Sequence, residues 1–206
     1  MQHKRRGNNV VILEKEPGQQ YSNHAGIGFG LNVERFLCEY DLTGITAAFP
    51  SHSWRWNSYT WNILNGRGIL RLTSWGLLYS ILRANFDATA SVACPEPPLP
   101  AKGDGHAVYY SGKRVIGLQI KEETVIVHFT NIHTGKQESL NADLVLGADG
   151  IHSTIRRLVN VPYVKRYAGY VVWRGIVAEK QLPPSTVQYF TNSITFNLSK
   201  RGYIVW

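Results

Sequence analysis

Four residues whose types could do chemistry stand at a fixed spacing late in the chain: Asp149, Gly150, Ser153 and Arg156. The apolar run at 144–146 before them is typical of a fully buried strand, and the residues after them are typical of a short helix. A carboxylate between a buried strand and a helix N-terminus lies where open α/β sheets bind ligands. A strand-to-helix turn capped by Asp149 is locally the commoner arrangement. The complete spacing Asp-Gly-x-x-Ser-x-x-Arg favours the ligand site over this simple turn.

A second carboxylate, Glu14, follows an apolar run at 9–13. It has the position of the acidic residue that hydrogen-bonds the adenosine ribose in a dinucleotide-binding fold, where the glycine fingerprint lies about 20 residues upstream. Residues 1–8 are then the end of the crossover helix and its glycine stop. We therefore expect the first strand and the glycine loop to be absent from this chain. A strand that ends in a charged residue is also ordinary, so Glu14 indicates a ribose site only in combination with the Asp149 motif.

Apolar periodicity predicts the elements that position these residues. Helical spacing predicts one helix after Asn32 and another with Ser74 as its N-cap. Alternating apolar residues predict an antiparallel meander that leads straight into a strand at 143–148. The segments of this meander are 106–110, 114–120, 125–129 and 137–141.

The sequence beyond residue 160 is rich in β-type segments. Residues 170–177 predict a strong strand, and the pattern continues over 185–190, 193–199 and 202–206. The expected fold class is α/β: a partial dinucleotide-binding, Rossmann-like domain with an antiparallel β meander, plus the start of a β-sheet substrate domain. We expect the first domain over residues 1–160 and the second over 161–206.

Composition and charge exclude several classes of protein. With 44% hydrophobic and 17% charged residues, the 206-residue chain is typical of soluble globular proteins, and no run is long enough to span a bilayer. The net charge of +8 rests on scattered basic residues and one short cluster, Lys4-Arg5-Arg6. Attraction of anionic cofactors and substrates is therefore a more economical explanation than nucleic-acid binding. Cys38 and Cys94 have neither metal-ligand nor disulfide spacing, which predicts a cytoplasmic location and no metal site.

Five stretches of the sequence together resemble the FAD-dependent aromatic-ring monooxygenases, the group that includes para-hydroxybenzoate hydroxylase. They are 11–15 (VILEK), 25–30 (AGIGFG), 73–78 (TSWGLL), the Asp149 motif and 167–175 (YAGYVVWRG). The resemblance covers nearly the whole chain and is nearest to fungal-type, dihydroxypyridine-hydroxylase-like members.

The resemblance implies an FAD site and a role for each matching residue. Glu14 would bind the adenosine ribose. The backbone at Gly26 and Gly28 would approach the cofactor closely, which a residue without a Cβ allows. Arg83 would partner the FAD phosphates, and the alternative is a surface arginine.

The resemblance assigns the remaining residues to the two substrates. Asp149, Gly150 and Arg156 would order the region of the pyrophosphate and the approach of NAD(P)H. Arg174, the one candidate catalytic residue, would hold an anionic or phenolic substrate, and the alternative is a solvated strand arginine. In such enzymes NAD(P)H reduces the flavin, which reacts with dioxygen to a flavin hydroperoxide that hydroxylates a small aromatic or heteroaromatic ring.

Two departures from the family pattern weigh against a working enzyme. Ser74 stands where relatives commonly carry an arginine, and no Gly-Asp motif for the flavin ribitol occurs before Trp206. With the glycine loop also absent, we expect a chain truncated at both ends. The alternative function is therefore a non-catalytic remnant that does not bind FAD stably, and we expect the polypeptide as given to be inactive.

Overall fold

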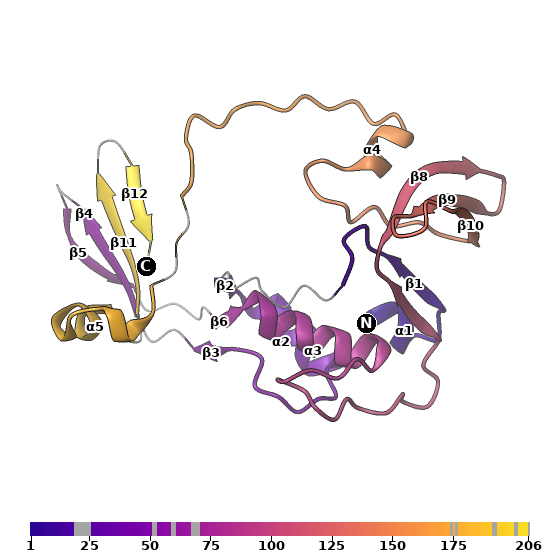
Figure 1. Ribbon diagram of the computed structural model, residues 1–206. Helices are drawn as coiled ribbons and strands as arrows, with labels where there is room; N and C mark the ends of the chain where they lie inside the picture. The colour runs from indigo at the N-terminus through magenta and orange to yellow at the C-terminus, as the bar shows by residue number, and fades with distance from the viewer. Residues whose placement is uncertain are drawn as a thin grey trace.

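The computed structural model describes the chain except for residues 19–25, 51–52, 59–60, 67–70, 174, 176, 191–192, 200–201 and 206. The elements, in chain order, are α1 (Gln2–Arg5), β1 (Val10–Leu13), β2 (Gly26–Phe29), α2 (Leu31–Tyr40), β3 (Phe49–Pro50), β4 (Ser53–Ser58), β5 (Trp61–Gly66), β6 (Arg71–Ser74), α3 (Trp75–Asp87), β7 (Ala107–Tyr110), β8 (Lys113–Ile120), β9 (Val125–Asn131), β10 (Gln137–Ala142), α4 (Thr154–Leu158), the 3-10 turn η1 (Glu179–Gln181), α5 (Pro184–Phe190), β11 (Ser193–Ser199) and β12 (Gly202–Val205) (Figure 1).

The strand predicted before Glu14 is confirmed as β1, which pairs in parallel with β7. Leu13 lies opposite Tyr110, so the two strands end at the same edge. Helix α1 precedes β1 and is followed by Gly7 in the left-handed region at φ 80°, as the predicted helix end and glycine stop require. Val11 and Ile12 stay exposed, because among the described residues β1 has a partner strand on one edge only.

The three later segments of the predicted meander are confirmed as the antiparallel sheet β10-β9-β8, whereas its first segment, 106–110, is wrong: it forms β7, which pairs in parallel with β1. Its central strand β9 buries Val127 and Phe129, while β10 alternates between exposed and half-buried positions. One extra residue, Ile116, interrupts the β8–β9 register between Val115 and Gly117. Such a bulge bends a strand and increases its twist.

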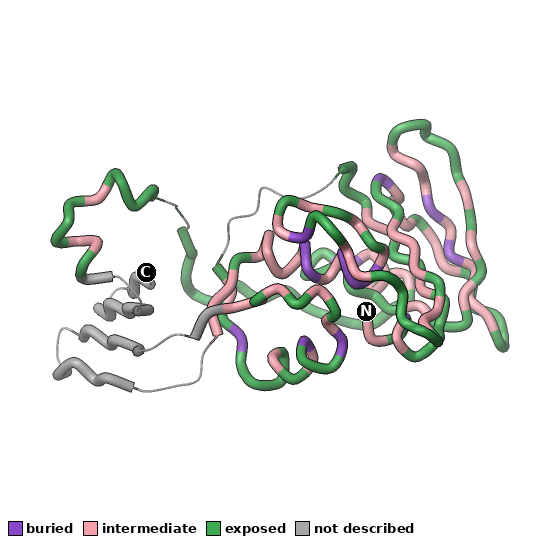
Figure 2. Tube along the Cα trace, turned by 90° about the horizontal axis from the view of Figure 1, so that it is seen from below, coloured by how far each residue is buried: buried purple, intermediate pink, exposed green. Residues whose placement is uncertain are grey.

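A second body of structure surrounds helices α2 and α3. Ser74 caps α3 as predicted, because its Oγ accepts a hydrogen bond from the Leu77 N–H at 3.1 Å. Ile81 and Ala84 on α3 are buried together with Leu37 on α2. Strand β6 leads into α3 and lies between β2 and β3 in a small antiparallel sheet. Figure 2 shows buried positions gathered in this helical region and on the meander.

The remaining sheet has the order β12-β11-β4-β5 and combines distant parts of the chain. Strand β11 pairs in parallel with β4, with Ser193 opposite Ser53. The predicted strands at 193–199 and 202–206 are confirmed as β11 and β12. This sheet takes β4 and β5 from the segment expected in the first domain, and β11 and β12 from the segment expected in the second.

Three predicted strands are wrong. The segment 185–190 is part of helix α5, which begins at Pro184, a residue that suits the first position of a helix. Residues 143–148 and the described part of 170–177 form no strand. Leu144 and Leu146 are each 66% exposed, and Trp173 is 91% exposed. A strand requires a neighbour for its backbone hydrogen bonds, and no described strand lies beside either segment.

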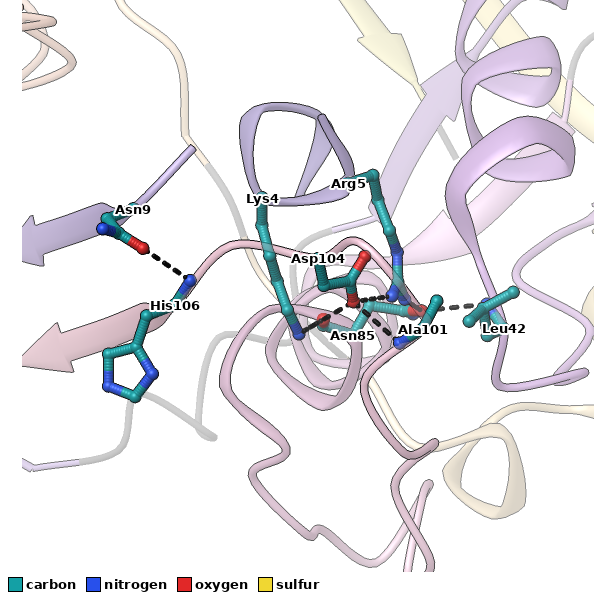
Figure 3. A network of polar contacts seen from close by, with 8 residues as sticks. All are labelled: Lys4, Arg5, Asn9, Leu42, Asn85, Ala101, Asp104 and His106. Carbon is teal, nitrogen blue, oxygen red and sulfur yellow. Dashed lines mark hydrogen bonds and ion pairs between the residues drawn. The ribbon is translucent and has the colours of Figure 1, made fainter. Parts of the chain in front are cut away.

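A buried ionic cluster joins the N-terminus to the strand edge of β7 (Figure 3). Arg5 Nη1 hydrogen-bonds Asp104 Oδ2, and Lys4 Nζ lies 3.8 Å from the same oxygen. All three side chains are less than 10% exposed. Burial and the charge of Arg5 lower the pKa of Lys4, while the Asp104 carboxylate opposes this shift. The carboxylate is therefore the group that makes two buried cations tolerable.

Asn85 on α3 connects this cluster to the end of α2. Its Oδ1 accepts hydrogen bonds from Arg5 Nη2 at 3.1 Å and from the Leu42 N–H at 2.8 Å. Its Nδ2 donates to Asp41 Oδ1 at 2.6 Å, and its backbone oxygen accepts from Lys4 Nζ at 2.8 Å. One buried amide thus fixes α1, α2 and α3 relative to one another.

Replacement Asp104→Asn is expected to lower the free energy of unfolding by about 3–5 kcal/mol, because Lys4 and Arg5 would be left buried without a counter-charge. Urea denaturation followed by circular dichroism measures this loss. The matched control is Glu16→Gln, which removes the carboxylate of the exposed Lys15–Glu16 pair and should change stability by less than about 0.5 kcal/mol. Equal effects of the two substitutions would contradict the role of Asp104.

Candidate functional site

Glu14 lies at the carboxyl edge of the parallel pair β1–β7. Its N–H donates to the Tyr110 carbonyl at 2.8 Å, and its carbonyl accepts from the Lys113 N–H at 2.8 Å. Its carboxylate Oε1 accepts from the Glu16 N–H at 2.9 Å. The residue is half-buried. The backbone of Glu14 is therefore fixed on both sides, while its carboxylate Oε2 takes part in none of these contacts.

Arg83 on α3 is held by its neighbours and is not a solvated surface arginine. Its Nε and Nη2 donate to the two Asp87 oxygens at 3.0 and 2.8 Å, and Nη2 also donates to Thr89 Oγ1 at 3.0 Å. Its Nη1 donates to the Tyr79 hydroxyl at 2.6 Å. Burial lowers the pKa of Arg83, but the Asp87 and Tyr79 hydrogen bonds outweigh burial and raise it overall. The guanidinium therefore stays charged at this edge.

Tyr109 on β7 connects Arg83 to Glu14. The Arg83 guanidinium carbon lies 3.8 Å from the centroid of the Tyr109 ring. Burial raises the pKa of Tyr109, as do its hydrogen bond with Tyr79 and the negative charge of Glu14. Since Ile12 lies opposite Tyr109, Glu14 two residues later projects from the same face of the strand pair. The Arg83 guanidinium thus lies against Tyr109, on the same strand pair that ends at Glu14.

The predicted glycines Gly26 and Gly28 lie on β2, which pairs with the strand that leads into α3. Gly26 is opposite Ser74, and Gly28 is opposite Leu72. A Cβ built at Gly26 would meet no atom within 4 Å, so this backbone faces open space. Helix α3 rises about 1.5 Å per residue, which places Ser74 and Arg83 about 14 Å apart along its axis. The glycine strand and the Glu14–Arg83 cluster therefore lie towards opposite ends of one helix.

The Asp149 motif folds into a turn that caps α4. Asp149 Oδ1 accepts from the Ser153 hydroxyl, and Oδ2 accepts from the N–H groups of Thr154 at 2.5 Å and Ile155 at 3.0 Å. The Ser153 hydroxyl oxygen accepts from the Arg156 N–H at 3.0 Å. Partial burial raises the pKa of Asp149, but the hydrogen bonds from Ser153, Ile155 and Thr154 outweigh it and lower the pKa below its ordinary value of 3.8.

Glycine is required at two positions of this turn for different reasons. Gly150 has φ 73°, in the left-handed region that disfavours other residues. A Cβ at Gly147 would lie 2.9 Å from Ile155 Cγ2, so the chain passes close to α4. The Arg156 guanidinium carbon lies 4.8 Å from the centroid of the Tyr163 ring. The capping role of Asp149, weighed above against ligand binding, is thus present, and it fixes where Arg156 lies.

Arg174, predicted to hold the substrate, lies outside the described residues. Its neighbours Trp173 and Gly175 are exposed. Sequence reasoning missed Tyr79 and Tyr109, which hold Arg83. Tyr79 is four residues before Arg83 and therefore on the same helical face, which is a detectable signal. Tyr109 becomes visible only through the pairing of β7 with β1.

Other kinds of site find no support in the described parts of the chain. They contain no group of three or more His, Cys, Asp or Glu residues placed to hold a metal ion. Across the same residues, no helix is long and apolar enough to cross a membrane. Lys4 and Arg5, which suggested a basic patch, are buried against Asp104.

Comparison with known proteins yields one family model and several relatives. The model described as FAD binding domain-like matches residues 167–206. The 2,6-dihydroxypyridine 3-monooxygenase of Paenarthrobacter nicotinovorans is 32% identical over 98 residues, which are 47% of this chain and 23% of that protein. The 6-hydroxynicotinate 3-monooxygenase of Pseudomonas fluorescens is 27% identical over 176 residues, 82% of this chain and 42% of that protein.

A solved structure agrees with these relatives. The 2,6-dihydroxypyridine-3-hydroxylase from Arthrobacter nicotinovorans superposes with a TM-score of 0.69 at 24% identity, covering 94% of this chain and 44% of that one. The chain spans less than half the length of each of these three proteins.

The mixed α/β fold and these matches agree on the class that the chain resembles: it is similar to FAD-dependent monooxygenases. Within that class, the matches above are dihydroxypyridine and hydroxynicotinate 3-monooxygenases. The resemblance predicted from the motifs is confirmed, as are the fold class and FAD as the cofactor of this family.

Replacement Ser153→Ala is expected to raise the pKa of Asp149, because the hydroxyl donor to the carboxylate is lost. Since the folded-state pKa lies below 3.8, the carboxylate stabilises the turn above that pH, and this stabilisation is lost as the pH falls through the folded value. NMR titration of the Asp149 carboxyl and the Thr154 amide measures both effects. Ser139→Ala on β10 is the control, and an unchanged Asp149 midpoint in Ser153→Ala would refute the assignment.

Proposed function

We propose that this chain supplies the FAD-binding part, and the beginning of the substrate-binding part, of an FAD- and NAD(P)H-dependent monooxygenase that hydroxylates a small aromatic or heteroaromatic ring. The observation that carries the proposal is Glu14 at the carboxyl edge of β1–β7, on one face with the Arg83 guanidinium. A carboxylate for a ribose diol and a cation for phosphates are what the adenosine half of a dinucleotide requires.

The residues fit the cofactor along helix α3. Glu14 binds the ribose, and Arg83 contributes positive charge near the phosphates, with one Nη1–H outside its four hydrogen bonds. At the other end of α3, the open backbone at Gly26 and its neighbour Gly28 face the rest of the cofactor without a Cβ in the way. An extended dinucleotide lying along α3 satisfies both ends.

The Asp149 turn and Arg174 serve the other reactants. Asp149 and Gly150 hold the turn, and Arg156 directs positive charge towards the pyrophosphate and the approach of NAD(P)H. Arg174 holds an anionic or phenolic ring. When bound, the flavin takes two electrons from NAD(P)H and activates dioxygen, so that one oxygen atom is transferred to the ring and the other leaves as water. The protein residues bind and orient, and none acts as a nucleophile.

The names of the relatives support the substrate class. Dihydroxypyridine and hydroxynicotinate are small hydroxylated heteroaromatic rings. We extend that class to this protein, and a reducing, cytoplasmic compartment with it. A basic nucleic-acid-binding function has no support, since two residues of its short cluster are buried in an ionic network.

A second candidate is a non-catalytic chain that keeps the fold but does not retain FAD. The exposed Leu144, Leu146 and Trp173 favour it, because a protein that binds its cofactor in a finished core covers such side chains. The two candidates differ in whether the purified chain binds flavin.

The purified 206-residue chain is expected to bind FAD, with the absorbance and fluorescence changes of bound flavin. Gly26→Ala should raise the Kd of FAD at least about tenfold, because the added methyl group occupies space that the cofactor needs. The midpoint of unfolding should stay near that of the wild type. Gly117→Ala, whose Cβ meets only ordinary contacts at 3.7 Å, is the matched control. A chain that binds no FAD supports the non-catalytic candidate instead.

A further inference from the structure

The basic side chains around α4 have no carboxylate to neutralise them. Between Asp149 and Glu179 the sequence has five Lys or Arg residues and no Asp or Glu. Elsewhere in the described residues cations pair with carboxylates, as Lys113 does with Glu138 at 2.9 Å, but no ion pair holds a described cation of this stretch. Both oxygens of Asp149 already accept hydrogen bonds within its own turn. The stretch is therefore an uncompensated positive surface.

The chain reverses its direction directly after α4. Asn160 has φ 54°, in the left-handed region that asparagine tolerates better than most residues. Its N–H donates to the Arg157 carbonyl at 3.1 Å, and the Val161 N–H donates to the Arg156 carbonyl at 3.1 Å. These two hydrogen bonds are the Schellman arrangement that ends a helix. The reversal is thus fixed by the backbone of α4 itself.

The returning segment brings two pairs of side chains together. Tyr163 lies against Arg156, whose guanidinium carbon is 4.8 Å from the centroid of the ring. Two residues later, Lys165 Nζ lies 2.8 Å from Nδ1 of His152, before the start of the helix. The segment therefore runs back along α4, and it holds the His152–Lys165 pair beside Arg156.

The His152–Lys165 pair offers hydrogen-bond donors together with a positive charge. An ammonium group donates and does not accept, so Nδ1 of His152 is the acceptor and the imidazole carries its proton on Nε2. The Nε2–H and the other two N–H groups of Lys165 take part in no contact among the described residues, and both side chains are exposed. Such a pair is suited to an anion that has several acceptor oxygens.

A phosphate monoester is an anion of this kind, with about −1.5 to −2 charges near pH 7 and three acceptor oxygens. The two forms of NAD(P)H differ by one such group, the 2′-phosphate of NADPH. We propose that the His152–Lys165 pair binds this 2′-phosphate and so selects NADPH over NADH, while Arg156 beside it meets the pyrophosphate of the same coenzyme. The inference rests on the proposed function and deepens it, because it chooses between two coenzymes.

Lys165→Gln tests the proposal, because it removes the charge and leaves a side chain that can still donate to His152. Binding of NADPH and NADH to the full chain is measured by calorimetry. The wild type should bind NADPH about tenfold more tightly than NADH. Lys165→Gln should raise the Kd of NADPH about five- to tenfold and change that of NADH by less than about twofold. Lys136→Gln, at an exposed lysine between β9 and β10, is the matched control and should change neither Kd by more than about twofold.

Adenosine monophosphates identify the group that is recognised. Adenosine 2′-monophosphate should bind at least about fivefold more tightly than adenosine 5′-monophosphate or inorganic phosphate. It should also shift the NMR signals of the His152 imidazole, and a higher concentration should be needed in Lys165→Gln. Equal binding of the 2′- and 5′-monophosphates would overturn the proposal.

The coenzymes and FAD together separate the two proposals. Equal Kd values of the wild type for NADPH and NADH, or a preference for NADPH that survives Lys165→Gln, would overturn the role of the pair. Equal weakening of NADPH and NADH by Lys165→Gln would overturn it too. When the wild type binds FAD, any of these results removes this inference alone. A wild-type chain that binds neither FAD nor either coenzyme would overturn the proposed function as well.

Discussion

The buried ionic contact of Lys4 and Arg5 with Asp104 determines the geometry of everything around Glu14. Strand β1 begins at Val10, five residues after α1 ends at Arg5, and β7 begins shortly after Asp104, so one carboxylate holds the starts of both parallel strands together. Their backbones approach so closely here that a Cβ at Gly105 would lie 2.0 Å from the Asn8 carbonyl oxygen. Strands that start in register end in register, and Glu14 and Tyr110 therefore meet at one edge.

The same contact reaches the helix that carries Arg83. Asn85 receives Arg5 at its side chain and Lys4 at its backbone, and it lies two residues from Arg83 on α3. Side chains two residues apart on a helix point in different directions. Within one turn of α3, Asn85 therefore faces the buried cations Lys4 and Arg5, whereas Arg83 faces Tyr109. The side of α3 that stabilises the fold and the side that carries Arg83 are thus fixed by one piece of backbone.

Local sequence patterns were sufficient to predict those elements that depend on their own residues. The Ser74 cap, the antiparallel strands β8 to β10 and the turn from Asp149 to Arg156 depend on neighbours close in sequence, and they form as expected. The strands at 144–148 and 170–177 were wrong because β-type residues form a strand only beside a partner, and local sequence does not reveal one. The candidate site likewise has a part that the sequence predicts and a part that only the fold reveals. Glu14 and Asp149 are visible from spacing, whereas the contact between Arg83 and Tyr109 depends on strand register and helix placement.

The parallel pairing of β4 with β11 has a consequence for how the chain forms. Ser53 pairs with Ser193, so the ends of this ladder are roughly 140 residues apart in sequence. During synthesis, β4 emerges long before β11 exists, while α1, α3 and β7 can already close around Asp104. Domains generally complete their N-terminal parts first as the ribosome proceeds. The part of the chain around Asp104 can therefore form before the β4–β11 ladder, which closes last.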